Sequence, residues 1–263
     1  MIPKLLHQIY LIGDLPEILR ANAAEHIERN PGWQHTLWTE PLAESFIRDS
    51  YGMDVLASYR MIDDQYLAAR ADLLRHLIIY KLGGVYFDIK GILERPLDEV
   101  LRPTDRYLLS QWDNLPGGSQ DGWGLHRDLA HVPGGEYVTN VIVAEPSHPY
   151  SKAAIEQISK NIASYKPWSA VGRTGTLRTT GPIAYTLAIE SVKNGALHRI
   201  VDQSELGSRV SIEGAYDHST ALERPHYSTL RHPLVAQRGI AKLLSRAALW
   251  LREQKKKTNA RLP

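Results

Sequence analysis

The feature that most constrains the fold is a helix followed by two glycines and a strand. Apolar residues recur at helical spacing from about residue 64 to residue 82, and Gly83 and Gly84 supply a helix stop. The apolar run at residues 84–89 then predicts a buried strand, with Gly91 just beyond it. Such a strand is typical of α/β sheets, in which ligands bind at the strand ends.

The segments on either side of this unit alternate between strand-like and helix-like patterns. This alternation predicts an α/β fold, a single Rossmann-like domain with a mostly parallel sheet flanked by helices. Residues 113–136 are rich in Gly, Asp and His, and we interpret them as a long loop that folds over a ligand. We expect strands at residues 5–11, 33–38 and 138–144, and helices at residues 16–29, 41–59 (one or two helices), 149–165 and 182–193.

Composition narrows the classes of function. At 263 residues and 43% hydrophobic content, the chain can bury one full core. Its net charge of +2 predicts no nucleic-acid partner, and the absence of cysteine excludes disulfides, thiolate catalysis and zinc–thiolate sites. We see no signal-peptide pattern and no apolar run near the roughly 18 residues that cross a bilayer, so we expect a cytoplasmic protein.

The predicted helix at residues 64–82 places Asp72, Arg75 and His76 within roughly 100° of one another, opposite an arc of leucine and isoleucine. Two interpretations of this face are open. It is either a solvated surface with an ion pair between Asp72 and Arg75, or a set of groups that bind a ligand.

In the strand that follows, side chains alternate, so that Tyr86, Asp88 and Lys90 point to one side of the sheet. A carboxylate at the end of an apolar strand must be hydrogen-bonded, paired or used, because burying an unpaired charge is costly. One interpretation is a structural ion pair between Asp88 and Lys90. The other is a functional site that holds both groups.

Four segments together resemble the glycosyltransferase family 32 sugar-binding region with its DXD-like motif. They are residues 2–10, 71–75, 83–88 and 95–97. The resemblance covers about the first 100 residues, and echoes follow at Asn140 and at Thr180-Gly181-Pro182. It implies a GT-A fold and transfer of a hexose, with retention, from a nucleotide-diphosphate sugar. The acceptor is a glycan or a lipid-linked molecule in the synthesis of cell-surface polysaccharide or glycolipid.

The resemblance also implies roles for individual residues. Asp72 and Arg75 bind hydroxyls of the donor sugar, and Asp88 contacts the ribose or a metal ion. The first strand flanks the nucleobase. We expect catalytic roles for Asp88 and Lys90, and donor-binding roles for Gln8, Ile9, Tyr10, Asp72, Arg75, Gly84, Tyr86, Asn140, Thr180 and Gly181.

The later echoes have a physical logic of their own. The helix after Thr180-Gly181 offers free backbone N–H groups, which either receive a phosphate or sugar hydroxyl or are simply capped. Asn140 lies in an apolar strand and needs a partner, which is either the sugar or a core group. Among the turn residues near the C-terminus, His226 is the preferred candidate for closing the donor site and the second candidate metal ligand beside Asp88.

Position 90 departs from the family pattern, which has its second aspartate there as the chief metal ligand. Mn²⁺ and Mg²⁺ prefer oxygen ligands, and the Lys90 ammonium offers none, but it can contact donor phosphates directly. The need for a divalent cation is therefore open. Two other classes are also open: a degenerate sugar-nucleotide-binding module and, ranked last, phosphotransfer through an aspartyl-phosphate.

The segment 239–263 differs from the transferase domain expected at residues 1–238, because it is basic and amphipathic. One interpretation is a helix docked on the protein's own core. The other is a helix at residues 239–257 that lies on anionic lipid at the inner membrane face, which suits a lipid-linked acceptor. The apolar positions are Ile240, Leu243, Leu244, Ala247, Ala248 and Leu251, with Trp250 at one border.

Overall fold

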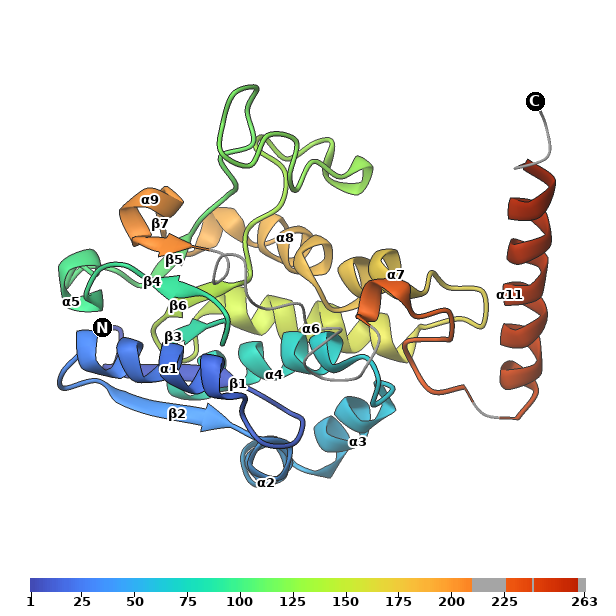
Figure 1. The fold of residues 1–263 in the computed structure, drawn as a ribbon, viewed down its shortest axis with the longest axis horizontal. Coiled ribbons are helices and arrows are strands. Elements are labelled where there is room, and N and C mark those ends of the chain that lie inside the picture. Colours follow the sequence, from blue (N-terminus) through green and yellow to red (C-terminus); the bar gives the residue numbers. More distant parts are fainter. Residues whose placement is uncertain (210–225, 238, 260–263) are drawn as a thin grey trace.

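The centre of the fold is a six-stranded sheet in the order β2-β1-β3-β6-β5-β7 (Figure 1). The computed structural model describes residues 1–209, 226–237 and 239–259. Only β6 among these strands runs antiparallel to its neighbours β3 and β5, so the predicted mostly parallel sheet is confirmed. The strands are β1 (Leu5–Ile9), β2 (Gln34–Trp38), β3 (Gly84–Phe87), β5 (Tyr107–Leu109), β6 (Val141–Ala144) and β7 (Arg199–Ile200).

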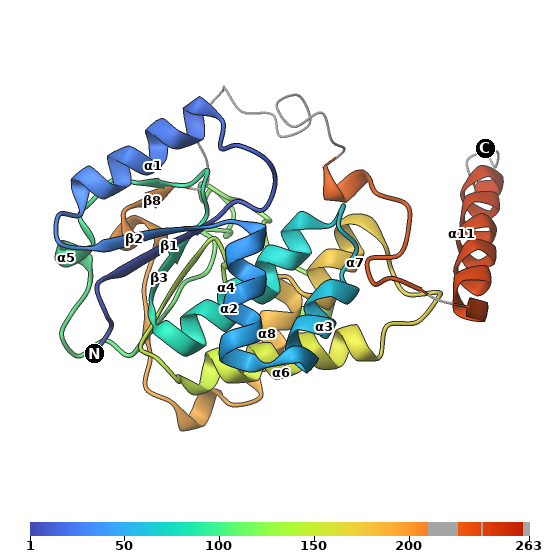
Figure 2. The same ribbon diagram turned by 90° about the horizontal axis from the view of Figure 1, so that it is seen from below.

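Helices cover both faces of this sheet (Figure 2), with α1 on one face and α4 and α6 on the other. A second, two-stranded sheet pairs β4 (Ile92–Leu93) with β8 (Ser208–Arg209). The helices are α1 (Glu17–Arg29), α2 (Glu40–Tyr51), α3 (Met53–Met61), α4 (Leu67–Leu82), α5 (Leu97–Val100), α6 (Pro149–Ala163), α7 (Gly172–Thr179), α8 (Pro182–Glu190), α9 (Gln203–Leu206) and α11 (Gly239–Asn259), with short 3₁₀ turns η1 (Arg127–Leu129), η2 (Lys193–Gly195) and η3 (Tyr227–Thr229).

Side chains alternate along the central strands and fill a core on each face of the sheet. Tyr86 and Ile142 belong to the core that includes α4, α6 and α8. Val85, Phe87 and Val143 belong to the core on the opposite face. Burial on both faces explains why β3 has no polar residue before its end.

Gly83 and Gly84 join α4 to β3 and bring β3 against β1. Their φ angles are +68° and +94°, which favour glycine. A Cβ atom on Gly84 would lie 2.5 Å from the carbonyl oxygen of Leu5, so the close approach of the two strands also requires glycine. The glycine pair therefore fixes where β3 enters the sheet.

Strand β3 ends at Phe87, earlier than predicted. The N–H of Gly91 donates to the carbonyl oxygen of Asp88 at 2.8 Å and closes a turn. The expectation that Asp88 and Lys90 share one strand face is therefore wrong, because Lys90 lies in this turn and not in the strand.

Candidate functional site

A cavity of about 850 Å³ lies at the carboxyl ends of β1 and β3. Its walls include the ends of these two strands, helix α4, the loop at residues 112–136, the residues just before β6, helices α7 and α8, and turn η3. The lining residues used below are Ile9, Tyr10, Asp72, Arg75, Tyr86, Asp88, Lys90, Trp112, Trp123, His126, Glu136, Asn140, Arg173, His226 and Tyr227.

The floor of the cavity is an array of three charged side chains. Arg75 forms an ion pair with Asp72, and its Nη1 lies 3.6 Å from Oδ1 of Asp88. Asp72 also accepts a hydrogen bond from the Thr180 hydroxyl at 2.8 Å, and Arg75 donates to the carbonyl oxygen of Thr139. Asp72 and Arg75 are buried, so the solvated helix face considered above is wrong.

The surroundings keep the arginine of this array charged. Burial raises the pKa of the Asp72 carboxyl, while Arg75 and Thr180 oppose that rise. Burial acts against the Arg75 charge, but the facing Tyr86, Asp72 and Asp88 raise its pKa above the ordinary value. The Arg75 guanidinium also lies over the Tyr86 ring, 4.9 Å from its centroid.

Asp88 has partners other than Lys90. It accepts a hydrogen bond from the Tyr86 hydroxyl and faces Arg75, so the structural Asp88–Lys90 pair considered above is wrong. Lys90 is half-buried, lines the same cavity, and forms no hydrogen bond or ion pair within the described ranges. Its ammonium is therefore a cation that faces the cavity without a described counter-charge.

His76 does not belong to this site. Its ring stacks on Tyr185, with centroids 5.0 Å apart, and neither ring nitrogen has a described hydrogen-bond partner. Burial, together with the charge of Arg75, lowers the pKa of His76 to about 3, so the ring is neutral. It is a core side chain.

Of the eight predicted donor-binding residues besides Asp72 and Arg75, four line the cavity and four lie behind its walls. Ile9 and Tyr10 line it, but the Gln8 amide is buried between His26 and His35 and is not a lining group. Gly84 likewise lies at the β1–β3 contact and not in the lining.

Thr180 and Gly181 also lie behind the wall. The Thr180 hydroxyl donates to Asp72, and Gly181 is the N-cap of α8. A Cβ atom on Gly181 would meet Oδ2 of Asp72 at 3.5 Å. Thr180 therefore positions Asp72, and neither Thr180 nor Gly181 lines the cavity.

Asn140 lines the cavity next to Asp88. The N–H of Asp88 donates to its carbonyl oxygen at 2.8 Å. The Asn140 side chain is buried, and neither atom of its amide has a hydrogen-bond partner among the described residues. Buried amides are normally satisfied, so this one is a candidate for contact with a ligand.

The side chains that line the cavity do not form a set of ligands that fits a protein-held divalent cation. His226 lines the cavity, with its Nδ1 2.8 Å from the Ser228 hydroxyl. The described part of the chain nevertheless contains no group of three His, Cys, Asp or Glu that could hold a metal. Asp88 is engaged by Tyr86 and Arg75, and two cations, Arg75 and Lys90, line the same cavity. No step of the chemistry below is assigned to a metal.

Sequence reasoning missed the residues contributed by the long loop. Glu136 accepts hydrogen bonds from Nε1 of Trp112 at 2.7 Å and contacts Nε2 of His126 at 2.8 Å. The ring of Trp123 meets that of Trp112 edge to face and is about half exposed (52%). The tryptophans were visible in the sequence, but their approach to Glu136 depends on how the loop folds.

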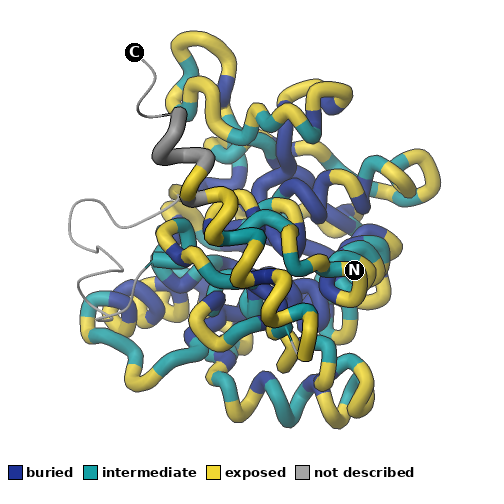
Figure 3. The backbone as a smooth tube through the Cα atoms, turned by 90° about the vertical axis from the view of Figure 1, so that its right-hand side faces the viewer, coloured by how far each residue is buried: buried dark blue, intermediate teal, exposed yellow. Residues whose placement is uncertain are grey.

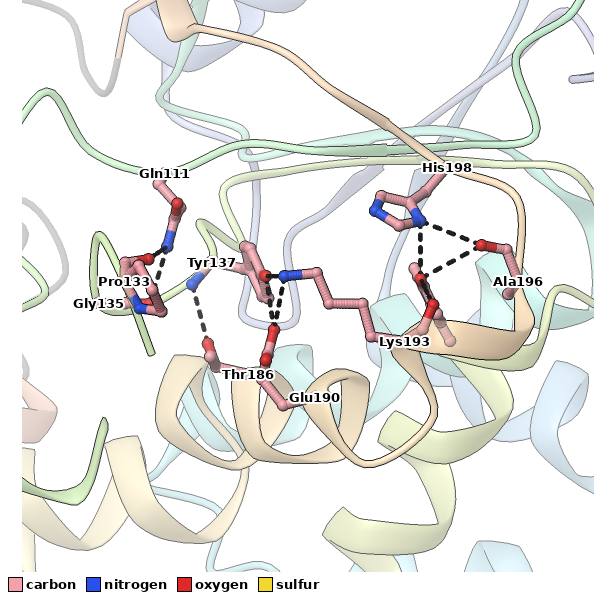
Figure 4. A network of polar contacts seen from close by, with 10 residues as sticks. Gln111, Pro133, Gly135, Tyr137, Thr186, Glu190, Lys193, Ala196 and His198 are labelled. Carbon is pink, nitrogen blue, oxygen red and sulfur yellow. Dashed lines mark hydrogen bonds and ion pairs between the residues drawn. The ribbon is translucent and has the colours of Figure 1, made fainter. Parts of the chain in front are cut away.

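The base of this loop is fixed by a polar network (Figure 4). The Gln111 amide donates to the carbonyl oxygens of Pro133 and Gly135 at 2.9 and 3.0 Å. The Tyr137 hydroxyl donates to Glu190 at 2.6 Å and accepts from Lys193 at 2.6 Å. The loop therefore starts and ends at an anchored point and presents Glu136 to the cavity.

The fold is that of a GT-A glycosyltransferase, as predicted. Among solved structures, the PaToxG glycosyltransferase aligns with 74% of this chain and 71% of its own, at a TM-score of 0.53 and 16% identity. Identity at this level shows the fold alone.

Residues 16–107 match the family model of the glycosyltransferase sugar-binding region containing DXD motif, the family that the resemblance indicated. The chain is also similar to a mannosyl phosphorylinositol ceramide synthase of Saccharomyces cerevisiae, with 26% identity over 71% of this chain and 49% of the relative. Inositol phosphoceramide mannosyltransferase 2 of Schizosaccharomyces pombe is 25% identical over 73% of this chain and 48% of its own. The chain thus matches about half the length of these relatives.

Proposed function

We propose that the chain is a retaining glycosyltransferase that moves a hexose from a nucleotide-diphosphate sugar to a glycan or lipid-linked acceptor. The observation that carries this proposal is the buried Asp72–Arg75–Asp88 array on the cavity floor, within the matched family region. The names of the two fungal relatives point to a mannosyl donor and an inositol phosphoceramide acceptor. From these names we take only the general substrate classes, a nucleotide-sugar donor and a glycan or lipid-linked acceptor.

The donor occupies the end of the cavity formed by β1, α4 and β3. Tyr10 and Ile9 offer an apolar surface for the base, and Asp72 and Arg75 face the sugar hydroxyls. The unsatisfied Asn140 amide supplies further hydrogen bonds beside Asp88. Groups already held by other parts of the protein bind without losing much side-chain freedom, which favours affinity.

Lys90 takes the place that the second aspartate and its metal hold in the family pattern. As the sugar–phosphate bond breaks, negative charge accumulates on the leaving diphosphate. An ammonium that lines the cavity and has no described counter-charge can neutralise it directly. Lys90 therefore stabilises the leaving group, and a divalent cation is not required.

The acceptor approaches from the side of the long loop. Trp112 and Trp123 supply aromatic surface, and Glu136 a buried carboxylate, on the wall that this loop contributes. Donor and acceptor then lie against different walls of one cavity. Synthesis of cell-surface polysaccharide or glycolipid and a cytoplasmic location stay predictions.

Replacement of Asp88 tests this assignment. Asp88→Asn should lower turnover of the active nucleotide-sugar by about 10²–10³-fold, the usual cost of losing one electrostatic contact in a transition state. Turnover is measured as donor hydrolysis and as transfer, in a screen of UDP- and GDP-sugars. Asp49→Asn, at an exposed aspartate of α2, is the matched control and should leave turnover unchanged.

The degenerate binding module predicts a different result. This second candidate function rests on Lys90, which stands where the family pattern has an aspartate. Wild-type protein that binds a donor but shows no turnover with any donor and acceptor tested, with or without Mn²⁺, would favour the module over the enzyme.

A further inference from the structure

Helix α11 is attached to the protein by the side that carries its small residues. Ser245 is buried, and Ala241 and Ala248, one turn away on either side, are partly buried. On the same side, Arg252 donates to the carbonyl oxygens of Trp168 and Ser169. The helix therefore contacts the rest of the protein, as one of the two interpretations has it, but not through its leucine stripe.

Leu249 is partly buried on the attached side, but the other five large apolar residues of α11 point away from this contact. They fall within about 120° of the helix circumference, on the side roughly opposite Ser245. Figure 3 looks onto the side of the molecule where α11 lies and shows exposed residues along it. The exposed fractions are 76% for Ile240, 64% for Leu243, 48% for Leu244, 59% for Trp250 and 60% for Leu251.

The charge of the helix differs in sign from that of the remaining chain. Residues 239–259 contain six Lys or Arg and one Glu, a formal charge of +5, whereas the whole chain carries +2. The rest of the chain is therefore net negative. Lys242 and Arg246 are exposed and flank the apolar side next to Trp250.

We propose that this outward side of α11 binds the surface of an anionic lipid bilayer. Leucine and isoleucine enter the acyl boundary, Trp250 lies at the headgroup level, and the flanking cations meet lipid phosphates. A second copy of the chain is the wrong occupant, because two helices of charge +5 would face each other. The proposal rests on α11 alone and stands whether or not the proposed transfer activity is correct.

The attachment point links α11 to the cavity. Trp168, which α11 holds by its carbonyl oxygen, is itself 59% exposed, and the chain continues from it into α7. Helix α7 contributes Arg173 and Thr176 to the cavity wall. The segment that α11 contacts therefore leads directly into the cavity wall.

Vesicle sedimentation tests the proposal with the full chain. Wild-type protein should bind phosphatidylcholine vesicles that contain about one third phosphatidylglycerol, and should bind pure phosphatidylcholine at least about tenfold more weakly. High salt should weaken the binding as surface charges are screened. Leu243→Gln with Trp250→Gln should lower the affinity by at least about tenfold at unchanged charge.

Two further variants separate the contributions. Lys242→Gln with Arg246→Gln should lower the affinity about 25-fold, since each basic residue near an anionic surface is worth about fivefold. Leu115→Gln with Leu197→Gln, at exposed leucines outside α11, is the matched control and should bind as wild type. Equal binding by wild type, α11 variants and control would overturn the proposal. So would a soluble dimer by light scattering that the Leu243/Trp250 variant dissociates.

Discussion

Helix α4 carries buried charged side chains, whereas helix α11 carries exposed leucines and an exposed tryptophan. In α4, Asp72 and Arg75 are buried and engaged by Thr180, between α7 and α8, and by Asp88, just after β3. In α11, five large apolar residues, Ile240, Leu243, Leu244, Trp250 and Leu251, are exposed. Both depart from the usual arrangement, in which helices bury apolar and expose charged residues. The difference indicates two kinds of contact: a prearranged internal site in one helix and an external surface in the other.

Replacing one arginine in each helix should give the largest difference in stability between the two helices. Arg75→Met should lower the free energy of unfolding by about 3–5 kcal/mol, because Asp72 is left buried without its counter-charge. Arg252→Met in α11 should change it by no more than about 0.5 kcal/mol, as expected for an exposed residue. Urea unfolding measures both.

Asp72→Asn tests whether the unpaired Asp72 charge causes the loss of stability in Arg75→Met. Added to Arg75→Met, it removes the unpaired charge and should recover part of the lost stability. An Arg75→Met loss as small as that of Arg252→Met would mean that the α4 charges are solvated, and the contrast between the two helices would disappear.

His76 predicts a smaller effect, which depends on pH. Its folded pKa is about 3, against an ordinary value of 6.5, so below about pH 6.5 the unfolded chain takes up a proton that the folded chain does not. Stability is therefore complete above pH 6.5 and falls as the pH drops toward 3, by about 1.4 kcal/mol per pH unit. Between pH 7 and pH 5, wild type should lose about 2 kcal/mol more than His76→Phe, which retains a ring against Tyr185.

His7 supplies the internal comparison for this titration. Its pKa is lowered to about 4 by burial, and it remains in the His76→Phe variant, which should therefore keep some acid sensitivity. Parallel stability–pH curves for wild type and variant would show that His76 is not a neutral buried ring.

The sequence predicted the parts of the fold that local patterns determine. Helical spacing and the pair Gly83-Gly84 located α4 and β3, and the resemblance to the family pattern selected Asp72, Arg75 and Asp88, which the structure places together. The end of β3 was placed too late, because the turn at residues 88–91 is closed by a backbone hydrogen bond and not by a residue type.

Other features depend on distant parts of the chain. Periodicity put His76 on a polar face, but Tyr185 covers that face and makes it part of the core. Glu136 joined the cavity only through the folding of the long loop around it. In α11 the apolar stripe was visible, but the contact through Ser245 and Arg252 was not, because small residues carry no strong hydrophobic signal.

The central claim is that a lysine of the chain takes the place of a metal at the donor diphosphate. Calorimetric titration of the active nucleotide-sugar in EDTA, and again in Mn²⁺, tests it most directly. Wild type should bind in EDTA, Lys90→Ala should bind at least about tenfold more weakly in both buffers, as for the loss of a charge-assisted contact, and Lys90→Asp should bind only with Mn²⁺. Wild-type binding that requires Mn²⁺ and is unaltered in Lys90→Ala would contradict the account.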